Sequence, residues 1–294
     1  AASQASDALV VERAEVHVGH EAGSLLVVDS EGTRLRMPIE ETTLRVSSHV
    51  RTADGMLLSD QRLWTHRLPE DLPDADEMVA EVEAMSRHLL ALAEAPEFEG
   101  EYVGPVIFED GAAIDLFRYI LLPQLQGTPP EVPFESWFGE LGGNGGDEVR
   151  LKRRVLPLGW GVIDDPERDP SHPASFTYDV EGSRAQAVEL VEDGIVQDVL
   201  MSRVPRKDTA QTNGHARGLG VRPQGRPSLL EVTPAKHLSD KKLRKRARAL
   251  SASYDRDYVL VVRRLQEPAV RSLGNGMGFS MFGFEGPALP SPVE

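Results

Sequence analysis

Residues 9–68 carry the hydrophobic pattern of antiparallel β-strands. An apolar run, Leu25–Val28, is followed by the turn-forming residues Asp29-Ser30-Glu31-Gly32. The segment Thr42–Val50 is rich in β-branched side chains, which favour strands. Asp54-Gly55 then has the composition of a tight hairpin turn. These signals predict an antiparallel meander.

The clearest helix is predicted over residues 74–95. Asp74 is a typical N-cap, and Glu77 follows three residues later as a capping-box partner. The apolar side chains that follow at helical spacing are Met78, Val82, Met85, Leu89 and Leu92. Because proline cannot continue a helix, we expect this one to end before Pro96.

The rest of the chain mixes short strands with two further helices. We expect a buried strand at Val103–Phe108 and a helix at Gly111–Leu125 that stops near Pro123. Residues 151–204 have the pattern of strands joined by tight turns. The remaining predicted elements are a strand at Leu230–Val232, a basic helix at 239–251 and a strand at Tyr258–Val262. We therefore predict an α+β fold with mainly antiparallel sheets and a few flanking helices.

The composition excludes several classes of protein and site. The formal net charge is −15, so general nucleic-acid binding, which depends on cations that neutralise phosphates, is not expected. No apolar run approaches the roughly 18–20 residues of a membrane-spanning helix. Cysteine is absent, which excludes disulfides, thiol nucleophiles and zinc sites that use sulfur. The basic helix at 239–251 is interpreted as a solvated face, with a nucleic-acid or partner surface as the alternative.

A cluster of acidic residues is the first candidate for chemistry. Asp164-Asp165-Pro166 is followed by Asp169 and His172, and carboxylates near an imidazole can hold a hard cation. The alternative is an Asp-rich turn, in which the carboxylates accept hydrogen bonds from nearby backbone N–H groups. We favour the turn.

The loop Thr212–Gly218 is the second candidate. Asn213, Gly214, His215 and Arg217 combine a position suited to positive φ, a titratable ring and a guanidinium outside any predicted helix. These residues are candidates for contact with a peptide or another ligand, together with Asp164 and Asp165. The alternative is a structural loop that packs over a sheet.

Several segments resemble one known family when they are taken in order. They are Val28–Gly32, Glu101–Phe108 with Gly111–Ala113, Val162–Pro166, Tyr178–Gly182 with Glu192–Val196, and Thr212–Arg217. Their order and spacing resemble the TldD/PmbA family, also called TldD/TldE and once described as modulators of DNA gyrase. The resemblance runs from about residue 24 to the C-terminus.

The resemblance implies a specific difference in chemistry. TldD-type subunits resemble metallopeptidases that carry His-Glu-x-x-x-His on a signature helix and use a later Cys as the third zinc ligand. In this sequence Arg118, Tyr119 and Pro123 stand at the positions of the first His, the Glu and the second His, and no Cys exists. We therefore expect no metal, no other cofactor and no catalytic residue here. Arg118 is hypothesised to hold a carboxylate or to plug the former metal site.

The resemblance also implies how the chain is organised. We expect a leading segment at 1–23, a central family region at 24–100 and a C-terminal TldD/PmbA-like domain at 101–294. The C-terminal domain is expected to be incomplete at its end, so that the chain is part of a longer, processed precursor. Segments at 201–203, 254–258 and 263–264 resemble a subgroup whose precursors often carry signal peptides, which favours an exported protein over a cytoplasmic one.

Three functions remain open, in order of preference. The first is a non-catalytic TldE/PmbA-like subunit, paired with a TldD-like paralogue or with itself, that helps to form the substrate chamber of a peptidase acting on unfolded peptides. Gly-rich loops at 142–146 and 211–225 are candidates for the border of that chamber. The second is a structural or assembly protein without proteolysis. The third is a peptidase whose chemistry has moved to His172 or His215.

Overall fold

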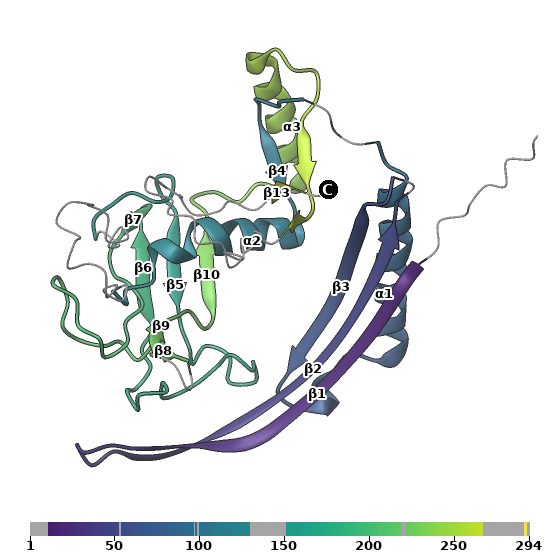
Figure 1. The fold of residues 1–294 in the computed structure, drawn as a ribbon. Coiled ribbons are helices and arrows are strands. Elements are labelled where there is room, and N and C mark those ends of the chain that lie inside the picture. The colour runs from purple at the N-terminus through teal and green to yellow at the C-terminus, as the bar shows by residue number, and fades with distance from the viewer. Residues whose placement is uncertain are drawn as a thin grey trace, which may run out of the picture. The chain divides into compact units, whose positions relative to one another are not determined.

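The computed structural model describes residues 11–52, 54–96, 98, 100–129, 151–218, 222–266 and 291–292. The chain divides into two compact units (Figure 1). The first unit combines Ala1–Gly100 with Pro166–Ala185, and the second combines Glu101–Asp165 with Gln186–Glu294. The predicted boundary between residues 23 and 24 does not separate two parts of the fold, because one strand runs through both residues.

The first unit is built on a three-stranded antiparallel sheet in the order β1-β2-β3. The strands are β1 (Val11–Val28), β2 (Arg34–Arg51) and β3 (Leu57–His66). Gly32 and Gly55 have positive φ in the two connecting turns, at the predicted turn positions. Because β3 ends opposite Thr42, β1 and β2 continue beyond it as a two-stranded ribbon (Figure 1). The predicted meander is confirmed.

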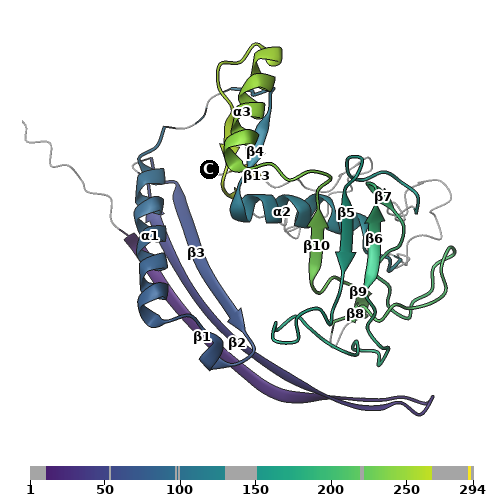
Figure 2. The same ribbon diagram turned by 180° about the vertical axis from the view of Figure 1, so that it is seen from behind.

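Helix α1 (Ala75–Ala93) packs against β2 and β3 (Figure 2). The Asp74 carboxylate caps it by accepting a hydrogen bond from the Asp76 N–H at 2.9 Å. Met85 and Leu89 are fully buried and pack at the helical spacing predicted from the sequence. A short 3₁₀-helix, η1 (Pro69–Asp71), precedes α1. The predicted helix and its N-cap residue are confirmed.

Residues 166–185 belong to the first unit although they lie far along the chain. Gly182 lies so close to Val27, Thr33 and Leu35 of the ribbon that a Cβ there would be 3.1 Å from the Thr33 methyl carbon. The Arg67 guanidinium donates to the Ser175 carbonyl oxygen at 2.8 Å. Neither contact has a local sequence signal.

The second unit is centred on a four-stranded antiparallel sheet in the order β10-β5-β6-β7. These strands are β5 (Gly161–Asp164), β6 (Val188–Glu192), β7 (Ile195–Val196) and β10 (Leu230–Thr233). Its buried apolar core is formed by Leu121, Leu125, Val162, Val188, Leu190, Val191, Val196, Val199, Leu200 and Met201.

Two helices accompany this sheet. Helix α2 (Asp110–Ile120) is followed by the 3₁₀-helix η2 (Leu122–Gln124), because Pro123 lacks the N–H that an α-helix needs. The α-helix is therefore shorter than predicted. Helix α3 (Asp240–Ser251), continued by η4 (Ala252–Tyr254), is the predicted basic helix.

The smaller sheets of the second unit have two strands each. Strands β4 (Val106–Phe108) and β11 (Leu260–Val262) pair in parallel. The antiparallel pairs are β8 (Ala216–Arg217) with β9 (Gln224–Gly225), and β12 (Leu265–Gln266) with β13 (Ser291–Pro292). The structure confirms the α+β class and the mainly antiparallel sheets. In the described part of the chain, no helix has the length and apolar character that crossing a membrane requires.

Candidate functional site

The positions expected for the zinc motif lie at the end of α2. Arg118 is in the last turn of α2, where the helix dipole stabilises a cation. Its side chain is exposed. Its guanidinium carbon lies 5.7 Å from the centroid of the Tyr119 ring. Pro123 is exposed in η2, beyond the end of the α-helix.

These residues do not fit a zinc ion. A zinc ligand must offer a lone pair, and neither a guanidinium nor a proline ring does so. No Cys exists to provide a sulfur ligand. Within the described ranges there is also no group of three or more His, Cys, Asp or Glu side chains that could hold a metal ion. The end of α2 therefore has no means of activating water through a metal.

The structure brings the two other predicted segments together in the second unit. Asp164, at the end of β5, and His215 are both fully buried, and His215 Nε2 lies 2.9 Å from Asp164 Oδ2. The backbone N–H of Ser228 donates to both carboxylate oxygens, at 3.1 and 3.0 Å. Buried carboxylates require such partners, because leaving a charge unpaired in the interior costs several kcal/mol.

Asn213 holds the other side of the imidazole. Its Oδ1 accepts from the Met201 N–H at 2.8 Å, and its Nδ2 donates to the Val199 carbonyl oxygen at 2.8 Å. These two backbone partners fix the orientation of the amide. His215 Nδ1 then lies 3.0 Å from the Asn213 carbonyl oxygen and 3.1 Å from Asn213 Oδ1. The network joins β5 to the loop before β8.

The same network limits what this loop presents to solvent. Asp164, Asn213, Gly214 and His215 are buried, whereas Asp165 and Arg217 are half-buried. The buried members have a structural function that the sequence could not reveal, since Ser228 and Met201 join the network through backbone N–H groups. Contact between this loop and a peptide or another ligand stays a prediction.

The remaining acidic residues of the predicted cluster form a turn. Asp169 accepts from the Ser171 hydroxyl at 2.6 Å and from the Ser171 N–H at 3.1 Å. The hydroxyl hydrogen bond is the main reason that the pKa of Asp169 is lowered. The exposed His172 ring accepts at Nδ1 from the Ala174 N–H. This arrangement agrees with the Asp-rich turn that we favoured, and it belongs to the first unit, whereas Asp164 belongs to the second. The loop at 142–146 lies outside the described residues.

Comparison with protein families identifies the chain. Residues 99–265 match the PmbA/TldA metallopeptidase C-terminal domain. The chain belongs to the TldD/PmbA family. The match covers α2, the four-stranded sheet, α3 and β11. No curated protein is similar enough to the chain to match it.

Two solved structures are similar to this TldD/PmbA-family chain. One is a proposed modulator of a DNA gyrase from Thermotoga maritima, with a TM-score of 0.54 and 20% identity over 81% of this chain and 48% of that one. The other is TldE from Thermococcus kodakarensis, with a TM-score of 0.49 and 18% identity over 81% of this chain and 48% of that one. The chain thus spans about half the length of the solved structures that it matches. The first similarity supports the same fold.

Proposed function

We propose that this chain is a zinc-free subunit of the TldE/PmbA type that helps to form the substrate chamber of a heteromeric peptidase acting on unfolded peptides. A zinc peptidase needs ligands for the metal and a general base to activate water. A chain without them can contribute peptide-binding surface but requires a second chain for hydrolysis. The zinc-bearing partner would be a TldD-like paralogue.

The observation that carries this proposal is the set of residues at the end of α2. By the family resemblance, Arg118, Tyr119 and Pro123 stand at the positions of both metal-binding imidazoles and the base. Arg118 and Tyr119 lie in α2, and Pro123 lies just beyond it in η2. Arg118 is a permanent cation held beside the Tyr119 ring, so it is suited to bind a carboxylate at this position. We assign it that role in the chamber.

The test is native mass spectrometry of the full-length protein purified from its source organism. We expect a second chain with the His-Glu-x-x-x-His motif and about one zinc ion for each pair of chains. Hydrolysis of an unfolded peptide should require both chains and should be lost when a chelator is added. A metal-free homomer would overturn the proposal and favour a structural or assembly function.

A pair of variants tests the assignment at α2. Arg118→His with Tyr119→Glu in this chain should not create a zinc site, because Pro123 and the missing Cys remain. The matched change in the partner, its first motif His to Arg, should remove zinc and activity together. Micromolar zinc binding by the double variant would contradict the assignment.

A further inference from the structure

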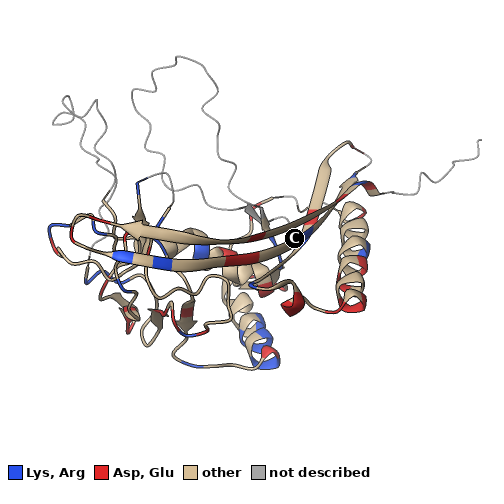
Figure 3. Ribbon diagram, turned by 90° about the horizontal axis from the view of Figure 1, so that it is seen from below, with Lys and Arg blue, Asp and Glu red and all other residues tan. Residues whose placement is uncertain are grey.

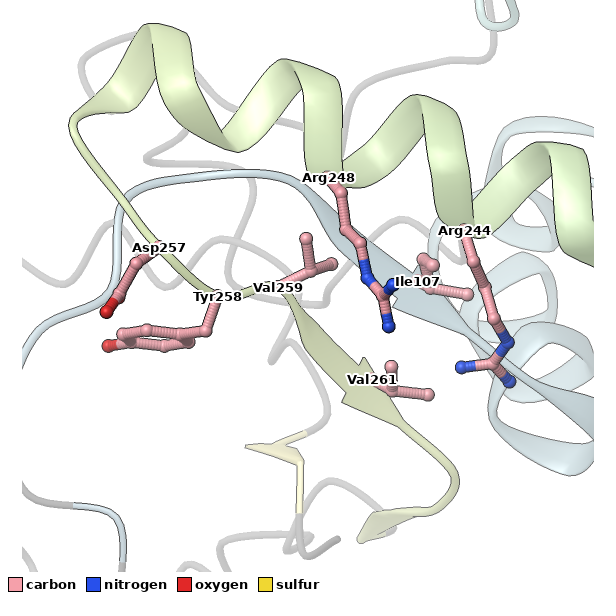
Figure 4. Close-up of a pocket in the computed structure, with 7 residues that line it drawn as sticks. All are labelled: Ile107, Arg244, Arg248, Asp257, Tyr258, Val259 and Val261. Atoms are coloured by element: carbon pink, nitrogen blue, oxygen red, sulfur yellow. The ribbon is translucent and has the colours of Figure 1, made fainter.

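A pocket with charged ends lies between α3 and the parallel pair β4–β11 in the second unit (Figure 4). Its volume is about 360 Å³, which is within the range of small-molecule sites. It is lined by Ile107, Arg244, Arg248, Asp257, Tyr258, Val259 and Val261. All of these residues lie on elements other than α2, which carries Arg118.

One end of the pocket is cationic. Arg244 is held by Asp240, whose carboxylate oxygens accept from its Nε at 3.0 Å, and by Glu109. The hydrogen bond to Asp240 is the main reason that the pKa of the Arg244 guanidinium is raised. Arg248 is one turn further along α3 and points to the same side (Figure 4). Its side chain makes no ion pair or hydrogen bond with any residue in the described part of the chain.

The other end of the pocket is acidic and aromatic. Figure 4 shows Asp257 and Tyr258 at the end away from Arg244. The Tyr258 ring is 5.4 Å from the ring of Tyr102, between centroids, so it has a fixed neighbour. Asp257 is exposed at the start of the segment that leads into β11.

Apolar side chains lie between the two charged ends. Ile107 is 7% exposed, and Val259 and Val261 are half-buried. From Asp257 to Val261 an extended chain spans at most about 14 Å. An extended peptide of about two or three residues has a length of roughly 7–11 Å, which is shorter than this upper bound. Figure 3 shows further Lys and Arg positions along α3, which would attract a carboxylate in an otherwise acidic chain.

We propose that this pocket binds the free C-terminus of a short, extended peptide. The terminal carboxylate pairs with the Arg248 guanidinium, whose planar fork matches two carboxylate oxygens. The N-terminal ammonium group of the peptide pairs with Asp257, and an apolar side chain rests on Val259 and Val261. The pocket needs no zinc-bearing partner, so this inference stands or falls separately from the proposed function.

The polarity of the pocket distinguishes this ligand from a simple anion. Phosphate, nucleic acid or an anionic lipid headgroup would use the guanidinium groups but would have no group to pair with Asp257. A molecule with a carboxylate at one end, an ammonium at the other and an apolar side chain between them is complementary to both ends and to the apolar middle.

Isothermal titration of the full-length protein with the tripeptide Gly-Val-Leu tests the proposal. We expect Arg248→Gln, or amidation of the peptide C-terminus, to weaken binding about fivefold, because the pair is bidentate but Arg248 is exposed. Amidation should have little further effect in Arg248→Gln, because both changes remove the same pair. Asp257→Asn and N-acetylation should each weaken binding about threefold, since Asp257 is exposed.

Arg246→Gln is the matched control, because it removes the same charge from the same helix. Arg246 is exposed, does not line the pocket, and lies about 160° from Arg248 around the helix. The affinity of the Arg246→Gln variant for the tripeptide should stay within about twofold of the wild-type value. Four results would each overturn the proposal. They are an equal loss of affinity in Arg246→Gln, equal affinity for the acid and amide forms of the peptide, competition by acetate alone at similar concentration, and no binding at about 10 mM peptide.

Discussion

In the first unit most of the β1 side chains are exposed, whereas the second unit encloses charged and polar side chains completely. Every residue of Glu12–Val18 is exposed, and α1 packs mainly against β2 and β3. In the second unit Asp164 and His215 are fully buried and Asn213 and Arg206 nearly so. The first unit also buries polar groups, Asp179 among them, so the contrast is between the exposed strand β1 and the enclosed Asp164 network.

This difference has consequences for stability. An exposed strand tolerates substitutions, because its side chains have few neighbours to lose. An enclosed polar network does not tolerate substitutions, because removing one side chain leaves its buried hydrogen-bond partner unsatisfied. Substitutions in each unit test this comparison, and hydrogen exchange can follow the two units separately in each case.

Asp164→Ala should have the largest effect. Removing the carboxylate leaves the Ser228 N–H and His215 Nε2 without their buried acceptor, and breaking a buried pair costs about 3–5 kcal/mol. Urea unfolding should show this loss in the second unit. Glu189→Ala is the control, since it removes an exposed carboxylate from the neighbouring strand β6 and should change the free energy of unfolding by less than about 0.5 kcal/mol. Similar losses in both variants would contradict the structural function of the Asp164 network.

Gly225→Ala and Gly23→Ala compare close backbone packing with an open strand. A Cβ at Gly225 would lie 1.9 Å from the Leu200 carbonyl oxygen, so the backbone must move at a cost of about 1–3 kcal/mol. A Cβ at Gly23 in β1 would meet no atom within 4 Å. Gly23→Ala should therefore be neutral or stabilising by about 0.5 kcal/mol. A destabilised Gly23→Ala would show that the ribbon is covered in solution.

Asp208→Asn should have the smallest effect, which is present at neutral pH and disappears in acid. The bidentate hydrogen bond from Arg206, at 2.8 Å to each oxygen, lowers the pKa of Asp208. A lowered pKa stabilises the fold above the ordinary Asp value, and this contribution is lost as the pH falls below about 4. Because the Asp208 side chain is 40% exposed, the loss should be at most about 1 kcal/mol.

Asp54→Asn is the corresponding variant of the first unit. Its pKa is lowered mainly by the Thr52 hydroxyl in the second hairpin turn. Exchange in the first unit should lose part of its acid dependence in Asp54→Asn and keep it in Asp208→Asn. The reverse pattern would show that the two units do not respond independently to pH.

The candidate site was only partly predictable. Arg118, Tyr119 and Pro123 were singled out only through the family resemblance, and their correspondence to the zinc motif stays a prediction. The sequence also singled out Asp164 and His215, but not their pairing, since they are 51 positions apart. Arg248 was seen only as part of a basic run, because its place in a pocket depends on the parallel pairing of β4 with β11.

The sequence by itself determined the elements that depend on neighbouring residues. Helix α1 follows from apolar spacing and the Asp74 cap, and the meander follows from β-branched strands joined at Gly32 and Gly55. The tertiary structure decided which distant groups meet: residues 166–185 on the ribbon, Asp164 with His215, and α3 over β11. Periodicity and turn preferences act over a few residues, whereas these contacts depend on how whole elements pack and satisfy one another's buried polar groups.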